Sequence, residues 1–598
     1  MDDPSPMKFL LVTGGTVSGL GKGTSTSSIG VVLKSHGLRV TAVKIDPYLN
    51  IDSGTMNPFD HGEVFVLEDG GEVDLDLGNY ERFLDLRLTS MHSITSGKIY
   101  EQVLKRERTG HYLGKTVQTV PHVTDAIQDW IIDVASKPVD RSGLAPDVCL
   151  IELGGTVGDL DCAMYLEALQ QLMFRVGKDN FLVAHVGMVP VMGATGEQKT
   201  KPCQHSVKLL REAGLKPDLI FCRSEQILEE ATRRKLSTFC QVPTGCIASL
   251  YDVSNIYRVP LLLAEQEIDL QICQLFNLPH LAATTQSVIG LSDVAMHQVP
   301  GEARNARLAD WKLLADRVDL CSEEVVIAVV GKYNGLHDSY LSVIKALKHA
   351  TVEVGLHLCV EWVESGDLEP NVQSLDPRRY ETAWWRLKSA NGVLVPGGFG
   401  DRGAEGKIRA INYCRTSNTP FLGIAGGLQL AVIEFARAEL GWESANSTEL
   451  DEATPHPVVV FMPEASATVQ GGTMRLGSRA TLIADEASLA YRLYGGHPTI
   501  YERHRHRYEV NPQCVPALES KNLKFSGKDE RGQRMQICEL RHHSFFFCTQ
   551  FHPEFRSRPA SPSPPFLALI LASAKRLEAR FREEGSLLKP GSGFESRV

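Results

Sequence analysis

Residues 9–24, FLLVTGGTVSGLGKGT, decide the fold of this 598-residue chain. An apolar strand at 9–12 runs into a glycine-rich loop, and a helix follows. Backbone N–H groups of such a loop at a helix N-terminus bind phosphate, and Lys22 adds a mobile positive charge. Five residues separate Gly15 from Gly21, one more than in a strict Walker A motif. A tight structural turn is the alternative, but the strand, glycines and lysine together favour phosphate binding.

The same alternation of short β-branched strands with helical stretches continues along the chain. It predicts an α/β fold with two doubly wound parallel-sheet domains. The domain at 1–295 is followed by a polar linker helix within 296–322, a second domain at 323–582 and a disordered tail at 583–598. The further predicted strands are 40–43, 148–151, 181–184, 219–222, 325–330, 392–396 and 421–424.

Composition excludes several classes of protein. The net charge of −10 gives no general attraction to nucleic acid or to an anionic membrane. The cysteines are scattered, with no paired C-x-x-C spacing and no secretory leader, so we expect reduced thiols in a cytoplasmic protein. No apolar run approaches the roughly 20 residues that a membrane span needs.

Polar residues stand where later strands of the first domain end. Lys44 closes the second strand, Asp76 lies in a stretch with three carboxylates, and Glu152 follows the strand at 148–151. Ligands of open α/β sheets bind beyond the carboxyl ends of the strands. Asp76 and Glu152 are therefore candidate Mg²⁺ ligands that would share the ion with a triphosphate. The alternative is a pair of solvated surface carboxylates.

The second domain contains an incomplete nucleophile site. Residues 420–429, PFLGIAGGLQ, read as a sharp strand-to-helix turn that presents a nucleophile above a sheet. Downstream, His552 could act as base and Glu554 could orient it. The segments resemble class I (triad) glutamine amidotransferases, in which a cysteine stands at the position of Ala425. Alanine has no thiol and cannot form the glutamyl thioester.

From residue 8 to about 575, the chain resembles the CTP synthase family. No single motif decides this, but their number and order do. The matching stretches are 18–23, 44–48, 61–65, 74–83, 152–159, 199–202, 204–207, 396–400, 446–449 and 502–509. The resemblance implies that a synthetase domain phosphorylates the uracil O4 of UTP with ATP and that ammonia then displaces phosphate to give CTP. The amidotransferase domain would supply ammonia from glutamine.

The resemblance also implies roles for individual residues. Lys44 would lie near the transferred phosphoryl group, and Mg²⁺ would bind Asp76 and Glu152. ATP phosphates would bind Gly19, Leu20, Gly21, Lys22, Gly23 and Thr24, and its base and ribose Tyr251, Asp252 and Val253. UTP would bind Ser18, Lys199, Thr200, Lys201, Pro202, Cys203, Gln204 and Lys235, and product CTP Asp159, Leu160 and Asp161. Glutamine would bind Gly398, Gln429, Glu449 and Arg507, with the Gly426 N–H facing the oxyanion.

Several positions depart from the family pattern. Ala425 replaces the cysteine, while Gly426 and Leu428 replace leucine and methionine. We therefore expect glutamine to bind without being hydrolysed. An engineered knock-out would change one residue, so these extra changes favour a natural paralogue. Asp161 stands for glutamate and Cys203 for threonine, and residues 90–93 differ as well.

The family's assembly and regulation extend these expectations. Members form homotetramers, and some form filaments through the helix at 380–384, where Glu381 here replaces a histidine; an ordinary surface helix is the alternative. GTP is an expected allosteric effector. Three hypotheses remain: an ammonia-dependent CTP synthase, a regulatory paralogue that co-assembles with an active CTP synthase, and a different nucleotide-dependent amidotransferase. The retained charged residues favour the first.

Overall fold

The structure is a computed structural model that describes residues 7–15, 17, 19–193, 195–278, 300–463 and 472–588. The chain divides into two compact units. The first comprises Met1–Asp52 and Asp76–Asp319, and the second comprises Ser53–Leu75 and Leu320–Val598. Within the described residues, no helix is long and apolar enough to cross a membrane.

The first unit is built on a seven-stranded sheet in which every neighbouring pair is parallel. All seven residues of the central strand β1 are buried, as expected of a parallel strand covered on both faces. In sheet order the strands are β5 (Ser93–Thr95), β2 (Val40–Asp46), β6 (Val148–Leu153), β1 (Lys8–Gly14), β7 (Phe181–Met188), β8 (Leu219–Arg223) and β9 (Ile247–Leu250).

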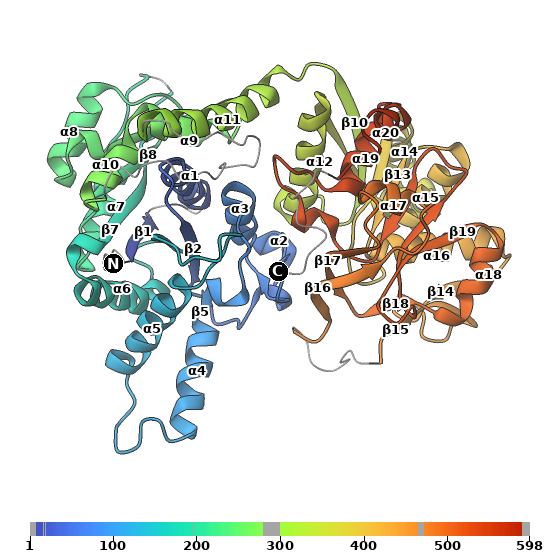
Figure 1. Ribbon diagram of the computed structural model, residues 1–598, viewed down its shortest axis with the longest axis horizontal. Coiled ribbons are helices and arrows are strands. Elements are labelled where there is room, and N and C mark those ends of the chain that lie inside the picture. The colour runs from blue at the N-terminus through green and yellow to red at the C-terminus, as the bar shows by residue number, and fades with distance from the viewer. Residues whose placement is uncertain are drawn as a thin grey trace. The chain divides into compact units, whose positions relative to one another are not determined.

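Helices flank this sheet (Figure 1). One apolar core cluster joins strand residues such as Leu11 and Ile151 to helix residues such as Ile127 and Leu169. The helices are α1 (Lys22–Ser35), α3 (Leu75–Leu84), α4 (Ser96–Arg108), α5 (Thr124–Ala135), α6 (Ala163–Val176), α7 (Lys201–Glu212), α8 (Glu230–Cys240), α9 (Arg258–Glu265), α10 (Ile268–Leu275) and α11 (Pro300–Leu320).

The second unit is built on a nine-stranded mixed sheet. Its first five strands are parallel, and the rest pair antiparallel. In order they are β11 (His357–Glu364), β10 (Glu324–Gly331), β12 (Gly392–Val395), β13 (Phe421–Ile424), β21 (Phe546–Thr549), β20 (Met535–Leu540), β19 (Leu523–Lys528), β16 (Arg475–Leu482) and β17 (Thr499–His506). A small sheet contains β14 (Ala445–Ser447), β15 (His456–Phe461) and β18 (Tyr508–Val510).

Two apolar clusters form the core of the second unit. Val329 and Leu422 belong to one, and their neighbours Val330 and Phe421 belong to the other, as the alternation of side chains along a strand requires. The helices are α12 (Leu341–Val354), α13 (Pro370–Leu375), α14 (Pro377–Ser389), α15 (Ala404–Ser417), α16 (Gly426–Glu439), α17 (Leu489–Leu493), α18 (Val515–Ser520), α19 (Pro564–Ser573) and α20 (Leu577–Glu584).

The segment Ser53–Leu75 groups with the second unit despite its early place in the chain. It contains α2 (Pro58–His61) and a two-stranded hairpin of β3 (Phe65–Val66) and β4 (Glu72–Val73). The buried Arg503 of β17 donates to the Val66 carbonyl at 2.9 Å and to Glu68 at 3.1 Å. Arg505 donates to Glu72 at 2.8 Å. These charge-assisted bonds tie the hairpin to the second unit.

The structure confirms the predicted α/β fold class: the main sheet of the first unit is parallel throughout, and that of the second is parallel over its first five strands. Each strand predicted from the sequence is a strand in the structure. Their local apolar patterns sufficed because buried parallel strands are nearly continuous runs of apolar residues.

Candidate functional site

The glycine loop of the first unit lies between β1 and α1, as the sequence predicts. Gly21 is the N-cap of α1 with φ 87°, a left-handed conformation that glycine adopts without steric cost. Gly23 lies against Asp76, because a Cβ at position 23 would stand 2.2 Å from the Asp76 Oδ1. Lys22 begins the helix and donates to the Gly155 carbonyl at 2.7 Å. Burial, with the nearby Lys44, lowers the pKa of Lys22.

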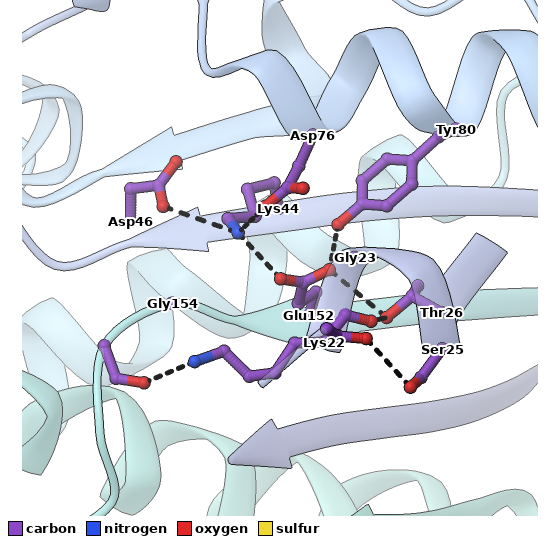
Figure 2. Close-up of polar contacts among 12 residues, drawn as sticks. Lys22, Gly23, Ser25, Thr26, Lys44, Asp46, Asp76, Tyr80, Glu152 and Gly154 are labelled. Carbon is purple, nitrogen blue, oxygen red and sulfur yellow. Dashed lines mark hydrogen bonds and ion pairs between the residues drawn. The ribbon is translucent and has the colours of Figure 1, made fainter. Parts of the chain in front are cut away.

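Lys44 joins the two candidate metal ligands (Figure 2). Its Nζ donates to the Asp76 carboxylate at 2.5 Å and to the Glu152 carboxylate at 2.7 Å. It lies 4.0 Å from Asp46. Burial acts to lower the pKa of Lys44, but these carboxylates outweigh it and hold the pKa well above its usual value. Three carboxylates at the ends of two neighbouring strands and one helix start therefore converge on a single ammonium group.

Glu152 is also held from a second side. The Tyr80 hydroxyl of α3 and the Thr26 hydroxyl of α1, the latter at 3.2 Å, both donate to its Oε2 (Figure 2). Burial raises the pKa of Glu152, whereas Lys44 overcomes burial at Asp76 and lowers the pKa of that carboxyl. Tyr80 is a member of the site that sequence reasoning missed; its place one helical turn after Asp76 is the signal that could have found it.

The donor set fits Mg²⁺ bound together with a nucleotide. Mg²⁺ usually takes one or two carboxylates plus phosphate oxygens and waters. Asp76 and Glu152 supply two such carboxylates, and both contact one cation already. Within the described residues no group of three or more His, Cys, Asp or Glu side chains forms a complete metal cage. The site therefore fits an ion shared with phosphate rather than one enclosed by protein.

The other nucleotide-binding candidates lie in loops and helix ends of the same unit. Tyr251, Asp252 and Val253 follow β9, and Asp252 pairs with Arg223. Asp159, Leu160 and Asp161 are exposed beyond β6, with Leu160 89% exposed. Ser18 lies outside the described residues.

The segment predicted to bind UTP runs into α7. Lys199 N–H donates to the Pro190 carbonyl at 2.9 Å, and Lys201 and Pro202 begin the helix. Gln204 donates to the Thr200 hydroxyl at 2.9 Å. Lys235 is exposed on α8. Cys203 is fully buried: a Cβ on Gly187 of β7 would stand 2.5 Å from its Sγ.

A cavity of about 350 Å³ in the second unit gathers the residues predicted to surround position 425. Residues from Ser53–Leu75 also line it, including Glu63, whose carboxylate accepts from the Ser342 N–H at 2.9 Å. The predicted residues that line it are Gly398, Ala425, Gly426, Gln429, Glu449, Arg507, His552 and Glu554.

Ala425 occupies the turn between β13 and α16. Its φ of 50° and ψ of −105° are unusual for a residue with a Cβ, and such strain persists only where the surroundings enforce it. The Ala425 N–H donates to the Thr549 carbonyl at 2.6 Å. His552 Nδ1 lies 2.7 Å from Glu554 Oε1. A Cβ on Gly397 would stand 3.3 Å from Ala425 Cβ and 3.2 Å from His552 Cε1, so both side chains face this loop.

The loop after β12 comes close to Gly426. A Cβ at position 426 would stand 3.2 Å from the Gly398 carbonyl oxygen. Glu449 accepts from the Gly400 N–H at 2.9 Å, and burial raises the pKa of Glu449. Gln429 donates to the Tyr508 carbonyl at 2.9 Å. Hydrogen bonds to the backbone therefore hold the side chains of Glu449 and Gln429 in place.

None of the described residues that line this cavity is a cysteine. Cys414 is buried in α15 and Cys548 in β21, where it pairs with Gly423 in register. Burial raises the pKa of both thiols. A buried, protonated thiol is a poor nucleophile, so neither has the properties of a substitute for a cysteine at position 425.

Lys407 is a further buried group that the sequence analysis did not single out. It lies in α15 and donates to the Pro396 carbonyl at 3.1 Å. Burial, with repulsion from Lys332, lowers the pKa of Lys407 to about 7. No local pattern marks it, because a lysine in an amphipathic helix reads as a surface residue.

The fold and the two sites define a protein that joins a phosphate-binding α/β unit to a class I glutamine amidotransferase unit. A family model described as CTP synthase N-terminus matches residues 8–278, and one described as glutamine amidotransferase class-I matches residues 336–572. CTP synthase 1 of Danio rerio is 51% identical over 99% of this chain and 96% of its own length. CTP synthase of Dictyostelium discoideum is 53% identical over 96% of this chain and 100% of its own.

This chain belongs to the CTP synthase family. The family places it among ligases of pyrimidine nucleotide biosynthesis that use ATP and UTP. Among solved structures, the glutaminase domain of Trypanosoma brucei CTPS with bound acivicin is 34% identical, with a TM-score of 0.39, and covers 42% of this chain and 94% of that domain.

Proposed function

We propose that this chain makes CTP from UTP, ATP and ammonia and does not hydrolyse glutamine. The single observation that carries the second part is Ala425 at the strained turn that faces His552, where the catalytic chemistry needs a nucleophilic sulfur. The first part is supported by Lys22, Lys44, Asp76 and Glu152, which retain the charges and contacts that phosphoryl transfer requires.

The proposed reaction has two balanced steps. The uracil O4 of UTP attacks the γ-phosphorus of ATP, the N3 proton is lost and ADP is released, which leaves a 4-phosphorylated UTP. Ammonia then adds at C4, a proton is lost, and the C4–O bond breaks to give CTP and inorganic phosphate. Bound Mg²⁺ would supply charge neutralisation at the phosphates, with Asp76 and Glu152 as its protein ligands.

The residues of the first unit would act chiefly by position and charge. The N–H groups at the start of α1 would face a phosphate of ATP, and Lys22 would supply a cation beside them. Lys44 would stabilise the charge that develops on the transferred phosphoryl group. Tyr80 and Thr26 hold the Glu152 carboxylate in one orientation.

The test is CTP formation by the purified protein with ATP, UTP and Mg²⁺, run in parallel with glutamine and with ammonium chloride. The proposal predicts CTP with ammonium and none with glutamine. Equal rates with both would contradict the reading of Ala425. GTP, the family's activator of glutamine hydrolysis, is then expected to leave the rate unchanged.

A second candidate is a regulatory paralogue that co-assembles with an active CTP synthase. It is favoured by Cys203 and Asp161, which change the predicted nucleotide segments in addition to Ala425. Failure of the protein purified alone to form CTP from either nitrogen source would support it, and so would its co-purification with an active CTP synthase in mixed tetramers.

For the first proposal, we further infer that the protein is cytoplasmic and forms a homotetramer. Filaments would form through the helix at 380–384.

A further inference from the structure

A buried hydrogen-bonded chain connects the glycine loop to α7 within the first unit. Thr13 Oγ1 lies 2.9 Å from His185 Nδ1, and His185 Nε2 lies 2.9 Å from Ser206 Oγ. The Ser206 hydroxyl lies 3.0 Å from the Cys203 carbonyl. Thr13, His185 and Ser206 are all fully buried. Three separate elements, β1, β7 and α7, thus meet at one imidazole.

The direction of each hydrogen bond in this series follows from the Cys203 carbonyl at its α7 end. A carbonyl only accepts, so the Ser206 hydroxyl donates to Cys203 and its oxygen accepts from His185 Nε2–H. Nδ1 of the neutral ring is then an acceptor, and the Thr13 hydroxyl donates to it at 2.9 Å rather than to the Ala184 carbonyl, which lies farther away at 3.5 Å. Burial, and secondly the charge of Lys22, lowers the pKa of His185 to about 4, so the ring is neutral near pH 7. Every donor and acceptor of the imidazole is used.

The glycine loop also lies against Ser206, at the α7 end of this series of hydrogen bonds. A Cβ on Gly15 would stand 2.1 Å from the Ser206 Cβ and 3.2 Å from His185 Nε2. The Gly15 N–H also donates to the Val186 carbonyl at 3.3 Å. Thr13 precedes the loop by one residue, and Ser206 follows the predicted UTP segment by two. A shift of the loop therefore presses directly on α7.

We propose that His185 is a positioning residue that couples occupancy of the glycine loop by ATP to the placement of α7, and hence to UTP binding. This inference rests on the proposed function, since it takes the loop and α7 as parts of the ATP and UTP sites. The ring of His185 is neutral near pH 7, so it does not act on the nucleotides through a charge. It acts through Thr13 on one side and Ser206 on the other.

The test measures UTP binding by calorimetry in Mg²⁺, with and without a non-hydrolysable ATP analogue. The wild-type protein is expected to bind UTP about fivefold or more tightly when the analogue is present, a typical coupling between two sites. His185→Gln loses the acceptor for Thr13, and His185→Asn loses the donor to Ser206. Both are expected to reduce the coupling below about twofold, while each nucleotide alone binds within about threefold of wild type.

Companion variants separate coupling from folding. Thr13→Val is nearly isosteric and removes only the hydroxyl, so it should lose the coupling as His185→Gln does, and Thr13→Ser should keep it. His349→Gln is the matched control, because His349 is a buried histidine whose Nδ1 lies 2.9 Å from the Ser557 hydroxyl in the second unit. It should retain wild-type coupling.

Three results would overturn the inference. Full coupling in the His185 and Thr13→Val variants would make the chain a purely structural feature. Equal loss in His349→Gln would mean that any buried histidine has the same effect. A wild type that binds both nucleotides without coupling would overturn this inference alone, whereas one that binds neither would overturn the proposed function itself.

Discussion

Each unit buries a lysine beside its candidate site, and the two lysines differ in their partners. Lys44 of the first unit lies within 4.0 Å of three carboxylates, and its pKa is held well above the usual value. Lys407 of the second unit has a carbonyl at 3.1 Å, and burial lowers its pKa to about 7. A buried charge is stable only when partners offset its desolvation. In the first site three carboxylates offset the charge of the buried lysine, whereas in the second burial disfavours the charged form of the lysine.

The two sites also differ in what they lack. The first holds the charged side chains expected for phosphoryl transfer: Lys44 contacts Asp76 and Glu152, and Lys22 donates to the nearby Gly155 carbonyl. The second has His552 beside Glu554, the strained turn at Ala425 and a cavity, but none of the described residues that line the cavity is a cysteine. The comparison teaches that packing and backbone hydrogen bonds can hold the architecture of a site whose nucleophile position is occupied by alanine. Four predictions test this comparison.

The largest expected effect comes from Ala425→Cys. If the surroundings of Ala425 remain competent, this change should raise glutamate release from glutamine by about 10⁴-fold, since loss of a nucleophile of this kind costs up to about 10⁶. Glutamate release and glutamine-dependent CTP formation are the measurements. The controls are Ala425→Ser and the double variant Ala425→Cys with His552→Ala, which should both stay near the wild-type level.

No gain with Ala425→Cys would mean that drift extends beyond position 425. Gly426 and Leu428 would be the next candidates, because both depart from the family pattern. Restoring a leucine at 426 requires the Gly398 loop to move, since a Cβ there would stand 3.2 Å from the Gly398 oxygen. We therefore expect the triple variant with Gly426→Leu and Leu428→Met to be less stable than Ala425→Cys alone.

The second prediction breaks the complete site. Lys44→Met should lower ammonium-dependent CTP formation by about 10³-fold, as expected for loss of a preorganised cation. It also leaves Asp76 and Glu152 facing each other without a counter-charge, which should cost about 3–5 kcal/mol of stability. Thermal unfolding checks this, and added MgCl₂ should restore part of the loss. Lys34→Met is the control, because Lys34 is a partly buried lysine of the same unit that donates to the Leu84 carbonyl rather than to a carboxylate.

A stability loss in Lys44→Met that MgCl₂ leaves unchanged would contradict the assignment of the two carboxylates to Mg²⁺. A loss of activity as large in Lys34→Met would show that activity does not depend on the carboxylate contacts of Lys44.

Local sequence pattern predicted the parts of these sites that lie next to strands. The loop after β1, Lys44 at the end of β2 and Glu152 in β6 follow from apolar runs that end in polar residues, because parallel strands place their carboxyl ends at one edge. The turn at Ala425 was also predicted from local pattern, whereas the glutamine-binding residues around the second cavity were named from family resemblance, since nothing local relates Gly398 to Arg507. Their individual roles stay predictions.

Long-range packing accounts for what the sequence did not reveal. Glu68 and Arg503 are 435 residues apart, so no local pattern relates the hairpin β3–β4 to β17. The burial of Lys407 depends on how α15 packs, and the contacts of His185 depend on the register of β1 with β7. Such contacts arise only when elements far apart in the chain come together.

The third prediction tests the buried Lys407, whose pKa burial lowers. Lys407→Met should stabilise the second unit by about 2 kcal/mol near pH 7, as buried charges replaced by apolar groups of similar size often do. The folded pKa of about 7 lies below the unfolded value of 10.5, so the wild type gains stability as pH rises between them. The advantage of the variant should therefore shrink by about 1.4 kcal/mol per pH unit above pH 7.

Urea unfolding of wild type and variant at pH 7, 8 and 9 measures this difference. Lys521→Met, at an exposed lysine of the same unit, should show no such pH dependence. A constant difference between Lys407→Met and wild type across this range would mean that Lys407 keeps its proton in the folded state.

The smallest expected effect concerns Tyr80, which donates to Glu152 without contacting substrate. Tyr80→Phe removes one hydrogen bond and keeps the ring that packs in the core, so folding should be preserved. Residues that orient a metal ligand typically change metal affinity 10- to 100-fold, and the second donor, Thr26, places the expected loss near tenfold. Mn²⁺ binding followed by electron paramagnetic resonance, in the presence of an ATP analogue, gives the affinity independently of turnover.

Tyr165→Phe is the matched control, because Tyr165 is a buried tyrosine of the same unit whose hydroxyl lies 3.1 Å from Ser96 rather than from a carboxylate. Equal affinities in Tyr80→Phe and wild type would show that Lys44 and Thr26 alone suffice to hold Glu152, and the completeness of the first site would then rest on charge rather than on orientation.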